Sequence, residues 1–322
     1  MGTCKSLQLS GHRLQGDQVR QLAHAAAASA TLEALHLANN SVTEDGSRAL
    51  AKAISSSKTL QIVDLTDNRI GTLGAAVLAK GIAASSSLRS LDLRNAHIGS
   101  EGAIALAAAI ARSDTFESLN ISGTNQLDSN CIQALSASIA VAKAFKGLNI
   151  AHNHLGPQAV SHLGFAVEQS PTLQELSLGS NDIDDRTVEA IADGLGQSTS
   201  FKRLHLWDNR VGDAGAIALA KAIGWSTSFE TLTLPDNRVG NEGAKALAGA
   251  ILESTTFRVL DLFRNSVGKE GAVALALAIR QTRHFSRLDL CKNPIAGGGK
   301  ALQVAKGANQ RVLIEWDTEQ GS

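Results

Sequence analysis

Few residues of this sequence have the type and spacing that metal binding or covalent catalysis needs. Of the nine histidines, only His152, His154 and His162 lie near one another, and imidazoles are common ligands of Zn²⁺. Such a site wants three or four ligands in a tetrahedron, and no Cys pair or His-Glu-x-x-His motif supplies them. Cys291 could be a reactive thiol, but no base accompanies it in the sequence. We therefore predict no metal, no cofactor and no catalytic residue.

Two other motifs of enzymes are incomplete. The run Gly297–Lys300 is superficially like a phosphate-binding loop, but it lacks the upstream glycine and the following Ser or Thr. A Gly-x-Ser-x-Gly nucleophile elbow does not occur. The sequence thus indicates a protein that is not an enzyme.

Three apolar side chains could instead bind another protein. Trp207, Pro235 and Phe263 follow one another at intervals of 28 residues, at a position that is elsewhere mostly small or polar. The residues around them are polar or charged: His205, Asp208, Asp236, Asp261 and Arg264. An aromatic centre with a charged rim is the usual composition of a protein-binding hot spot. We predict that these eight residues contact a partner; the alternative is that the aromatic rings only brace the sheet beneath them.

A second group of charges is predicted as a secondary contact surface. It consists of Asp64, Asp92 and Arg94, with Asp67 beside it. If it binds a partner, it would select a basic or mixed-charge surface. The simpler interpretation is that these charges are solvated.

A repeating unit positions all of these residues. An apolar residue, two residues, Leu, one residue, Leu, two residues and Asn recur at intervals of 28, with one interval of 29. The units begin at Cys4, Leu32, Leu60, Leu88, Phe116, Phe145, Leu173, Phe201, Phe229, Phe257 and Phe285. Apolar residues two apart, such as Val63 and Leu65, face one side of a strand. Apolar residues four apart, such as Leu219 and Ile223, form one face of a helix. About eleven strand–helix repeats are therefore predicted.

Two more positions of the unit indicate how successive coils stack. A buried Asn, as at Asn68 and Asn209, has donors and an acceptor for the main chain of its own turn and of the next coil, which predicts a ladder of asparagines. Six residues later comes a small residue, usually Gly as at Gly215, which we attribute to close packing of the helix on the sheet. Each unit then buries its apolar faces only against its neighbours.

This pattern resembles the leucine-rich repeat family from residue 4 to about residue 316. Its period is similar to that of the ribonuclease-inhibitor-like class, which includes the Ran GTPase-activating protein and the receptor ends of NOD-like receptors. The resemblance implies an α/β fold, a right-handed curved solenoid or horseshoe with parallel strands on the concave face and helices on the convex face. We predict a single domain over residues 1–322, with repeats from about 4 to 311, a capping strand at 312–316 and a polar tail.

The amino-acid composition limits the kinds of partner and the compartment that we expect for this chain. Lys plus Arg and Asp plus Glu both number 30, so no net field attracts nucleic acid or anionic lipid. Three widely spaced cysteines fit a reducing compartment and exclude a disulfide framework. No apolar run approaches the ~20 residues that span a bilayer, and the first residues do not form a signal peptide. We expect a cytoplasmic protein that binds neither nucleic acid nor membranes.

The functional prediction is a non-enzymatic scaffold that binds a protein partner through its concave face. One alternative is a GTPase-activating protein of the Ran-directed type acting on a small GTPase, although the long acidic tail typical of those proteins is missing. Another is the ligand-sensing fragment of a NOD-like receptor, whose nucleotide-binding domain this chain lacks. Partner identity and oligomeric state are open at this stage.

Overall fold

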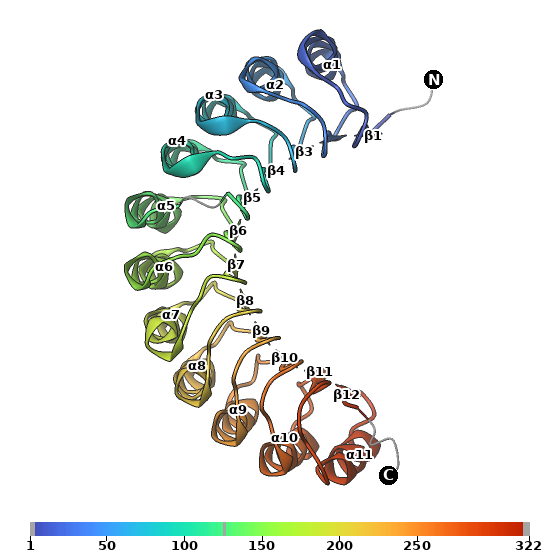
Figure 1. Ribbon diagram of the computed structural model, residues 1–322, viewed down its shortest axis with the longest axis vertical. Helices are drawn as coiled ribbons and strands as arrows, with labels where there is room; N and C mark the ends of the chain where they lie inside the picture. Colours follow the sequence, from blue (N-terminus) through green and yellow to red (C-terminus); the bar gives the residue numbers. More distant parts are fainter. Residues whose placement is uncertain (1–3, 125–126, 318–322) are drawn as a thin grey trace. The chain divides into compact units, whose positions relative to one another are not determined.

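A computed structural model describes residues 4–124 and 127–317. Within these residues eleven helices alternate with twelve three-residue strands, which confirms the predicted α/β repeat (Figure 1). The chain divides into two compact units. The N-terminal unit is Met1–His154 with Ser170–Leu173, and the C-terminal unit is Leu155–Gln169 with Gln174–Ser322. The single domain over 1–322 stays a prediction.

The N-terminal unit contains six strands that pair in parallel, each with the next along the chain. The strands are β1 (Ser6–Gln8), β2 (Ala34–His36), β3 (Ile62–Asp64), β4 (Ser90–Asp92), β5 (Ser118–Asn120) and β6 (Gly147–Asn149). The helices between them are α1 (Gly16–Ala28), α2 (Glu44–Ser56), α3 (Gly71–Ala84), α4 (Gly99–Arg112) and α5 (Ser129–Val141). The helices form one layer and the strands the other, so one face of this sheet is left for solvent.

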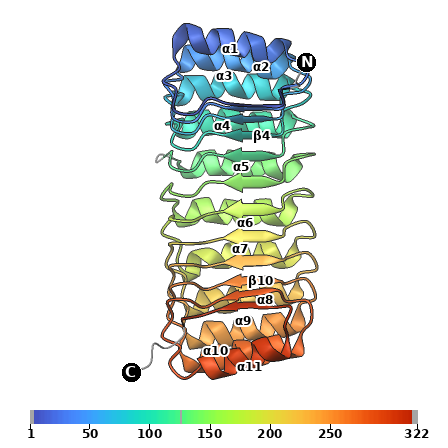
Figure 2. The same ribbon diagram turned by 90° about the vertical axis from the view of Figure 1, so that its right-hand side faces the viewer.

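The C-terminal unit repeats this arrangement, with its strands side by side like rungs (Figure 2). Its strands are β7 (Glu175–Ser177), β8 (Arg203–His205), β9 (Thr231–Thr233), β10 (Val259–Asp261), β11 (Arg287–Asp289) and β12 (Leu313–Glu315). Its helices are α6 (Pro157–Gln169), α7 (Asp185–Gln197), α8 (Asp213–Trp225), α9 (Asn241–Glu253), α10 (Lys269–Gln281) and α11 (Gly299–Ala308). Strand β12 falls inside the predicted capping strand.

Large side chains stack between the two layers at the repeat spacing. In the C-terminal unit the buried rings of Phe201, Phe229, Phe257 and Phe285 follow one another with centroids 6.0, 6.1 and 5.8 Å apart. Leu219 and Ile223 are fully buried on the inner face of their helix, as the periodicity predicts. The core is therefore a continuous row of identical layers within the unit.

The predicted asparagine ladder is present. The Asn209 side-chain amide donates to Leu206 O in its own coil and to Leu178 O in the preceding coil, both at 3.0 Å. Its Oδ1 accepts from the N–H of Ile183 at 3.0 Å. Asn68 makes the same bonds in the N-terminal unit. Each buried amide thus satisfies its own polar atoms and ties two coils together.

The reason predicted for the recurring glycine is wrong at Gly215. A Cβ atom there would lie 2.8 Å from Val188 Cγ1 of α7 and 2.9 Å from Val211 Cγ1 in the loop that enters α8. Asp185 Oδ1 of α7 lies nearer still, at 2.7 Å, so the missing side chain lets α8 approach the preceding helix and its own entry loop.

Candidate protein-binding surface

The apolar residues Trp207, Pro235 and Phe263 lie side by side on the strand face of the C-terminal unit, just beyond β8, β9 and β10; we call them the apolar strip. Two backbone hydrogen bonds fix their alignment. The Asp208 N–H donates to Pro235 O and the Asp236 N–H donates to Phe263 O, both at 2.9 Å. All three side chains are half-buried. The strip is therefore a fixed apolar row that solvent reaches.

The indole of Trp207 lies across the backbone of Gly179 in the preceding coil. A Cβ atom at Gly179 would come within 2.0 Å of Trp207 Cε2 and 2.3 Å of Cδ2. The ring thus rests in the space that glycine leaves, and part of its surface braces the neighbouring coil. Since the side chain is still half-buried, its remaining surface is open to a partner.

Proline fits at position 235 because the sheet does not use the amide there. In the next two coils the corresponding N–H groups belong to Phe263 and Cys291. They donate to side-chain oxygens two residues earlier, Asp261 Oδ1 and Asp289 Oδ1, each at 2.9 Å. Pro235 has no N–H to donate, so it enters this column without removing a hydrogen bond between strands. Proline at this position therefore leaves the pairing of the strands intact.

Part of the charged rim of the strip is held by contacts within the chain. Arg264 Nη1 lies 3.0 Å from Asp236 Oδ1, and its guanidinium carbon lies 5.9 Å from the centroid of the Phe263 ring. Asp208 accepts a hydrogen bond from the hydroxyl of Ser180. Arg264 has a φ of +52°, in the left-handed region that Asp and Asn tolerate better than Arg. These contacts hold the rim in place before any partner arrives.

Asp261 is a rim carboxylate without an ion pair, as is Asp208 in the described part of the chain. No Lys, Arg or His side chain in the described part of the chain forms an ion pair with it, and its Oδ1 accepts only the N–H of Phe263. Burial raises the pKa of Asp261, as do the negative charges of Asp289 and Glu315, and these effects outweigh the hydrogen bond from Phe263 and the positive charge of Arg287, which lower it. A positive group from a partner would offset this unfavourable environment.

His205 belongs to a network whose other members sequence reasoning missed. Its Nδ1 lies 3.0 Å from Thr233 Oγ1 and its Nε2 3.4 Å from Glu175 Oε1. Arg203 Nε donates to Glu175 Oε2 at 2.8 Å. The hydrogen bond with His205 and that with Arg203 lower the pKa of Glu175 to about 2, against the opposing effect of burial. Glu175 and Arg203 begin their strands and face the same side as His205, so the strand period would have identified them.

The predicted secondary group lies on the strand face of the N-terminal unit. Asp64 Oδ1 accepts from the N–H of Thr66 at 3.0 Å, and Asp92 Oδ1 accepts from the N–H of Arg94 at 2.9 Å. The Arg94 guanidinium also forms an ion pair with Asp92, with 3.3 Å between Nη2 and Oδ2. Asp67 accepts from the side chain of Asn95 at 2.8 Å. Both carboxylates at the ends of β3 and β4 therefore hold the turn that follows, whatever else they contact.

The structure also describes the residues considered for covalent or metal chemistry. Residues 4–124 and 127–317 contain no group of three His, Cys, Asp or Glu side chains arranged to hold a metal ion. Burial and then the charge of Asp289 raise the pKa of Cys291 to about 11, so its thiol is protonated at neutral pH. The Gly297–Lys300 run leads into α11, whose first residue is Gly299.

A helix that spans a membrane needs about 20 mostly apolar residues. No helix in the described ranges combines the length and the apolar character that crossing a bilayer requires.

Comparison with known proteins agrees with the repeat geometry. The family described as Leucine Rich repeat matches residues 56–79, 84–107, 169–192, 197–220, 226–248 and 253–276. The chain carries leucine-rich repeats. A solved structure titled Leiomodin-1 Actin-Binding Site 2 (ABS2) is similar with a TM-score of 0.38 and 20% identity, over 44% of this chain and 82% of that chain. Among curated proteins none matches significantly. The ribonuclease-inhibitor-like class stays a prediction.

Proposed function

We propose that this leucine-rich repeat chain is a non-enzymatic scaffold that binds a partner protein on the strand face of its C-terminal unit. The observation that carries the proposal is the apolar strip: three large apolar side chains in register, in a column that is otherwise mostly small or polar. Strands in a sheet lie about 4.8 Å apart, so the strip spans about 10 Å, the length of a short partner segment. The eight predicted residues form the contact surface, and we add Glu175 and Arg203 to it.

The surface has the energetic features of a hot spot. Truncating an aromatic anchor at the centre of an interface typically costs 2 kcal/mol or more of binding free energy. Here the ring of Trp207 rests on Gly179 and the guanidinium of Arg264 is held by Asp236. Side chains that are already ordered lose less conformational entropy on binding. The secondary group, Asp64, Asp92 and Arg94, is proposed as a weaker contact, because its polar atoms are engaged within the chain.

Quantitative affinity capture from a cell extract tests the proposal. We expect the Trp207→Ala/Phe263→Ala variant to capture at least tenfold less partner protein than the wild type. Phe263→Ala alone should reduce the captured amount by less. Phe165→Ala is the matched control, because it removes an aromatic side chain that is 52% exposed on helix α6 of the same unit. Circular dichroism verifies folding of each variant. Equal capture by the wild type and the double variant would refute the site.

The absence of enzymatic activity needs its own measurement. We expect the purified chain to leave GTP hydrolysis unchanged across a panel of small GTPases. Accelerated hydrolysis by any of them would replace the scaffold proposal with a GTPase-activating function.

A further inference from the structure

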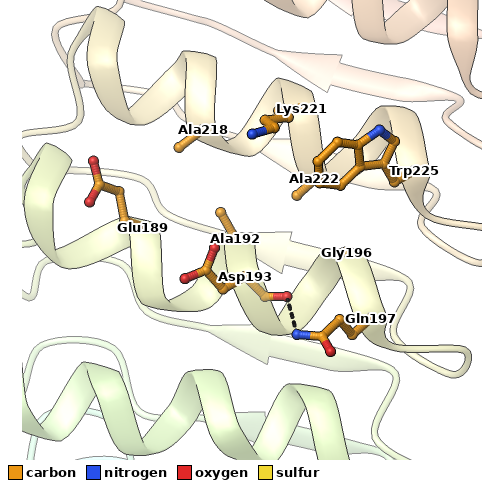
Figure 3. A pocket seen from close by; sticks show the side chains of 9 residues that line it. All are labelled: Glu189, Ala192, Asp193, Gly196, Gln197, Ala218, Lys221, Ala222 and Trp225. Atoms are coloured by element: carbon orange, nitrogen blue, oxygen red, sulfur yellow. Dashed lines mark hydrogen bonds between the residues drawn. The ribbon is translucent and has the colours of Figure 1, made fainter.

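A groove of about 510 Å³ lies between α7 and α8, in the helix layer of the C-terminal unit and away from the apolar strip (Figure 3). Its floor is made of small residues, Ala192 and Gly196 from α7 and Ala222 from α8. A Cβ atom at Gly196 would find only Ala222, at an ordinary contact distance of 3.7 Å. Packing of the two helices therefore does not require glycine at this position, and the empty space belongs to the groove.

The two helices that flank the groove carry complementary outer edges. On α7 the residues four apart are Glu189, Asp193 and Gln197; on α8 they are Ile217, Lys221 and Trp225. Residues four apart lie on one face of a helix. Within residues 127–317, where both edges lie, no salt bridge engages the carboxylates of Glu189 and Asp193. One edge is thus acidic, and the other is apolar and basic.

The large apolar side chains of the apolar and basic edge are exposed to solvent. Trp225 is 66% exposed and Ile217 is 46% exposed. The Lys221 ammonium lies 4.9 Å from the centroid of the Trp225 ring, so the two side chains form one surface. Tryptophan buries about 150–250 Å² when it is covered, so Trp225 offers a large apolar contact at this edge.

We propose that a second copy of this chain occupies the groove, as a two-fold symmetric dimer in which each α7 faces the α8 of the other copy. In a two-fold symmetric contact the same patch of both copies meets, so one patch must contain both the acidic edge and the basic edge that pairs with it. Helices α7 and α8 of one chain carry these two edges. The chain has 30 basic and 30 acidic residues, so no net charge keeps two copies apart.

The repeat register selects the orientation of this dimer. Asp193 and Lys221 are separated by 28 residues, one repeat, so they stand at the same height on adjacent helices. A two-fold axis along the groove, parallel to the helices, brings Asp193 of one copy opposite Lys221 of the other. It also brings Trp225 opposite the Gly196 end of the groove. An axis across the helices would place Asp193 against Asp193, which like-charge repulsion disfavours.

Analytical ultracentrifugation of the full chain, from about 1 to 200 μM, tests the dimer. A small interface associates weakly, so the fraction of dimer depends on the protein concentration. We expect a monomer–dimer equilibrium in the wild type. Trp225→Ala should raise the dimer dissociation constant at least tenfold. Gly196→Leu should do the same by filling the groove while the fold is retained.

A charge exchange identifies the contact itself. Lys221→Glu and Asp193→Lys should each weaken the dimer at low salt at least tenfold, and the double variant should restore it. Lys80→Glu is the matched control, since Lys80 holds the position of Lys221 in α3 of the N-terminal unit. Trp207→Ala/Phe263→Ala should dimerise as the wild type does, which separates this proposal from the proposed function. A chain that is monomeric at every concentration, an effect of Lys80→Glu equal to that of Lys221→Glu, or failure of the double variant to recover would overturn the proposal.

Discussion

The contact between Trp207 and Gly179 shows how one residue prepares the surface for another. Gly179 is the one glycine among the column positions that include Trp207, Pro235 and Phe263, and the indole lies over it. The sequence could place Trp207 on the strand face by its period. It could not show that the ring turns toward Gly179, because the direction of a side chain depends on the space its neighbours leave.

Gly179→Ala should therefore displace the indole. The new Cβ would overlap Trp207 Cε2, which lies 2.0 Å from its ideal position. We expect a loss of about 1–3 kcal/mol in the free energy of unfolding, typical of overpacking, and a red-shifted Trp207 fluorescence in a Trp225→Phe/Trp316→Phe background. Gly249→Ala is the control, because a Cβ there meets nothing within 4 Å. An unshifted spectrum with unchanged stability would show that the ring does not rest on Gly179.

Asp261→Asn should stabilise the chain in a pH-dependent way. The folded state raises the pKa of Asp261, so its ionised form is less favourable folded than unfolded. The amide keeps an oxygen for the N–H of Phe263 and removes the charge. We expect a gain below about 1 kcal/mol at pH 7, kept small by solvent screening, that disappears as the pH falls to about 3, below the usual pKa of an aspartate, because the carboxyl is then protonated in both the folded and the unfolded chain. Urea unfolding at both pH values measures this. A gain that grows on acidification would contradict the sign of the shift.

At the scale of elements, a side chain at the start of one helix caps the start of the next helix in the middle coils of the C-terminal unit. Asp213, the first residue of α8, accepts the N–H groups of Gly240 and Gly243 at the start of α9, at 2.7 and 2.8 Å. Asp185 does the same for α8 and Asn241 for α10. Unsatisfied N–H groups at a helix start are thereby capped from the neighbouring coil. The sequence did not predict these caps, because periodicity does not reveal which coil a side chain reaches.

Removing one such cap should destabilise the unit. We expect Asp213→Ala to cost about 1–2 kcal/mol of unfolding free energy, the usual cost of a lost helix cap. Asp213→Asn should cost less than half as much, since Asn241 already makes the equivalent pair of hydrogen bonds, both at 2.9 Å. Chemical denaturation of the two variants provides the measurement. Equal losses would mean that the side chain contributes by something other than accepting those hydrogen bonds.

At the scale of the molecule, most of the fold could be predicted because most repeats share the same pattern of residues. Strands, helices, the asparagine ladder and the buried faces all follow from the 28-residue period. Side-chain contacts between coils could not be predicted, since they depend on how one coil packs against the next. This is why the sequence did not show that Gly215 lies close to a neighbouring helix or that His205 reaches Glu175, although the strand period places both of those side chains on one face.

A repeat architecture should tolerate the loss of one whole unit. Deletion of residues 229–256 joins Ser228 to Phe257 in register, so Asn265 and Gly271 can take the places of Asn237 and Gly243. We expect a cooperatively folded chain of lower stability, because each repeat contacts mainly its neighbours. Deletion of only residues 229–242 breaks the register and should abolish cooperative unfolding. Thermal unfolding followed by circular dichroism compares the two, and similar behaviour of both deletions would contradict quasi-one-dimensional packing.

Site-specific photocrosslinking tests the central claim most directly, namely that a partner protein contacts the apolar strip. A benzophenone amino acid replaces Phe263 on the strand face in one variant and Trp225 on the helix layer of the same unit in another. We predict that irradiation in a cell extract yields a crosslinked partner from position 263 and not from position 225, where only a second copy of the chain should be trapped. A foreign protein captured from position 225 and none from position 263 would contradict the account.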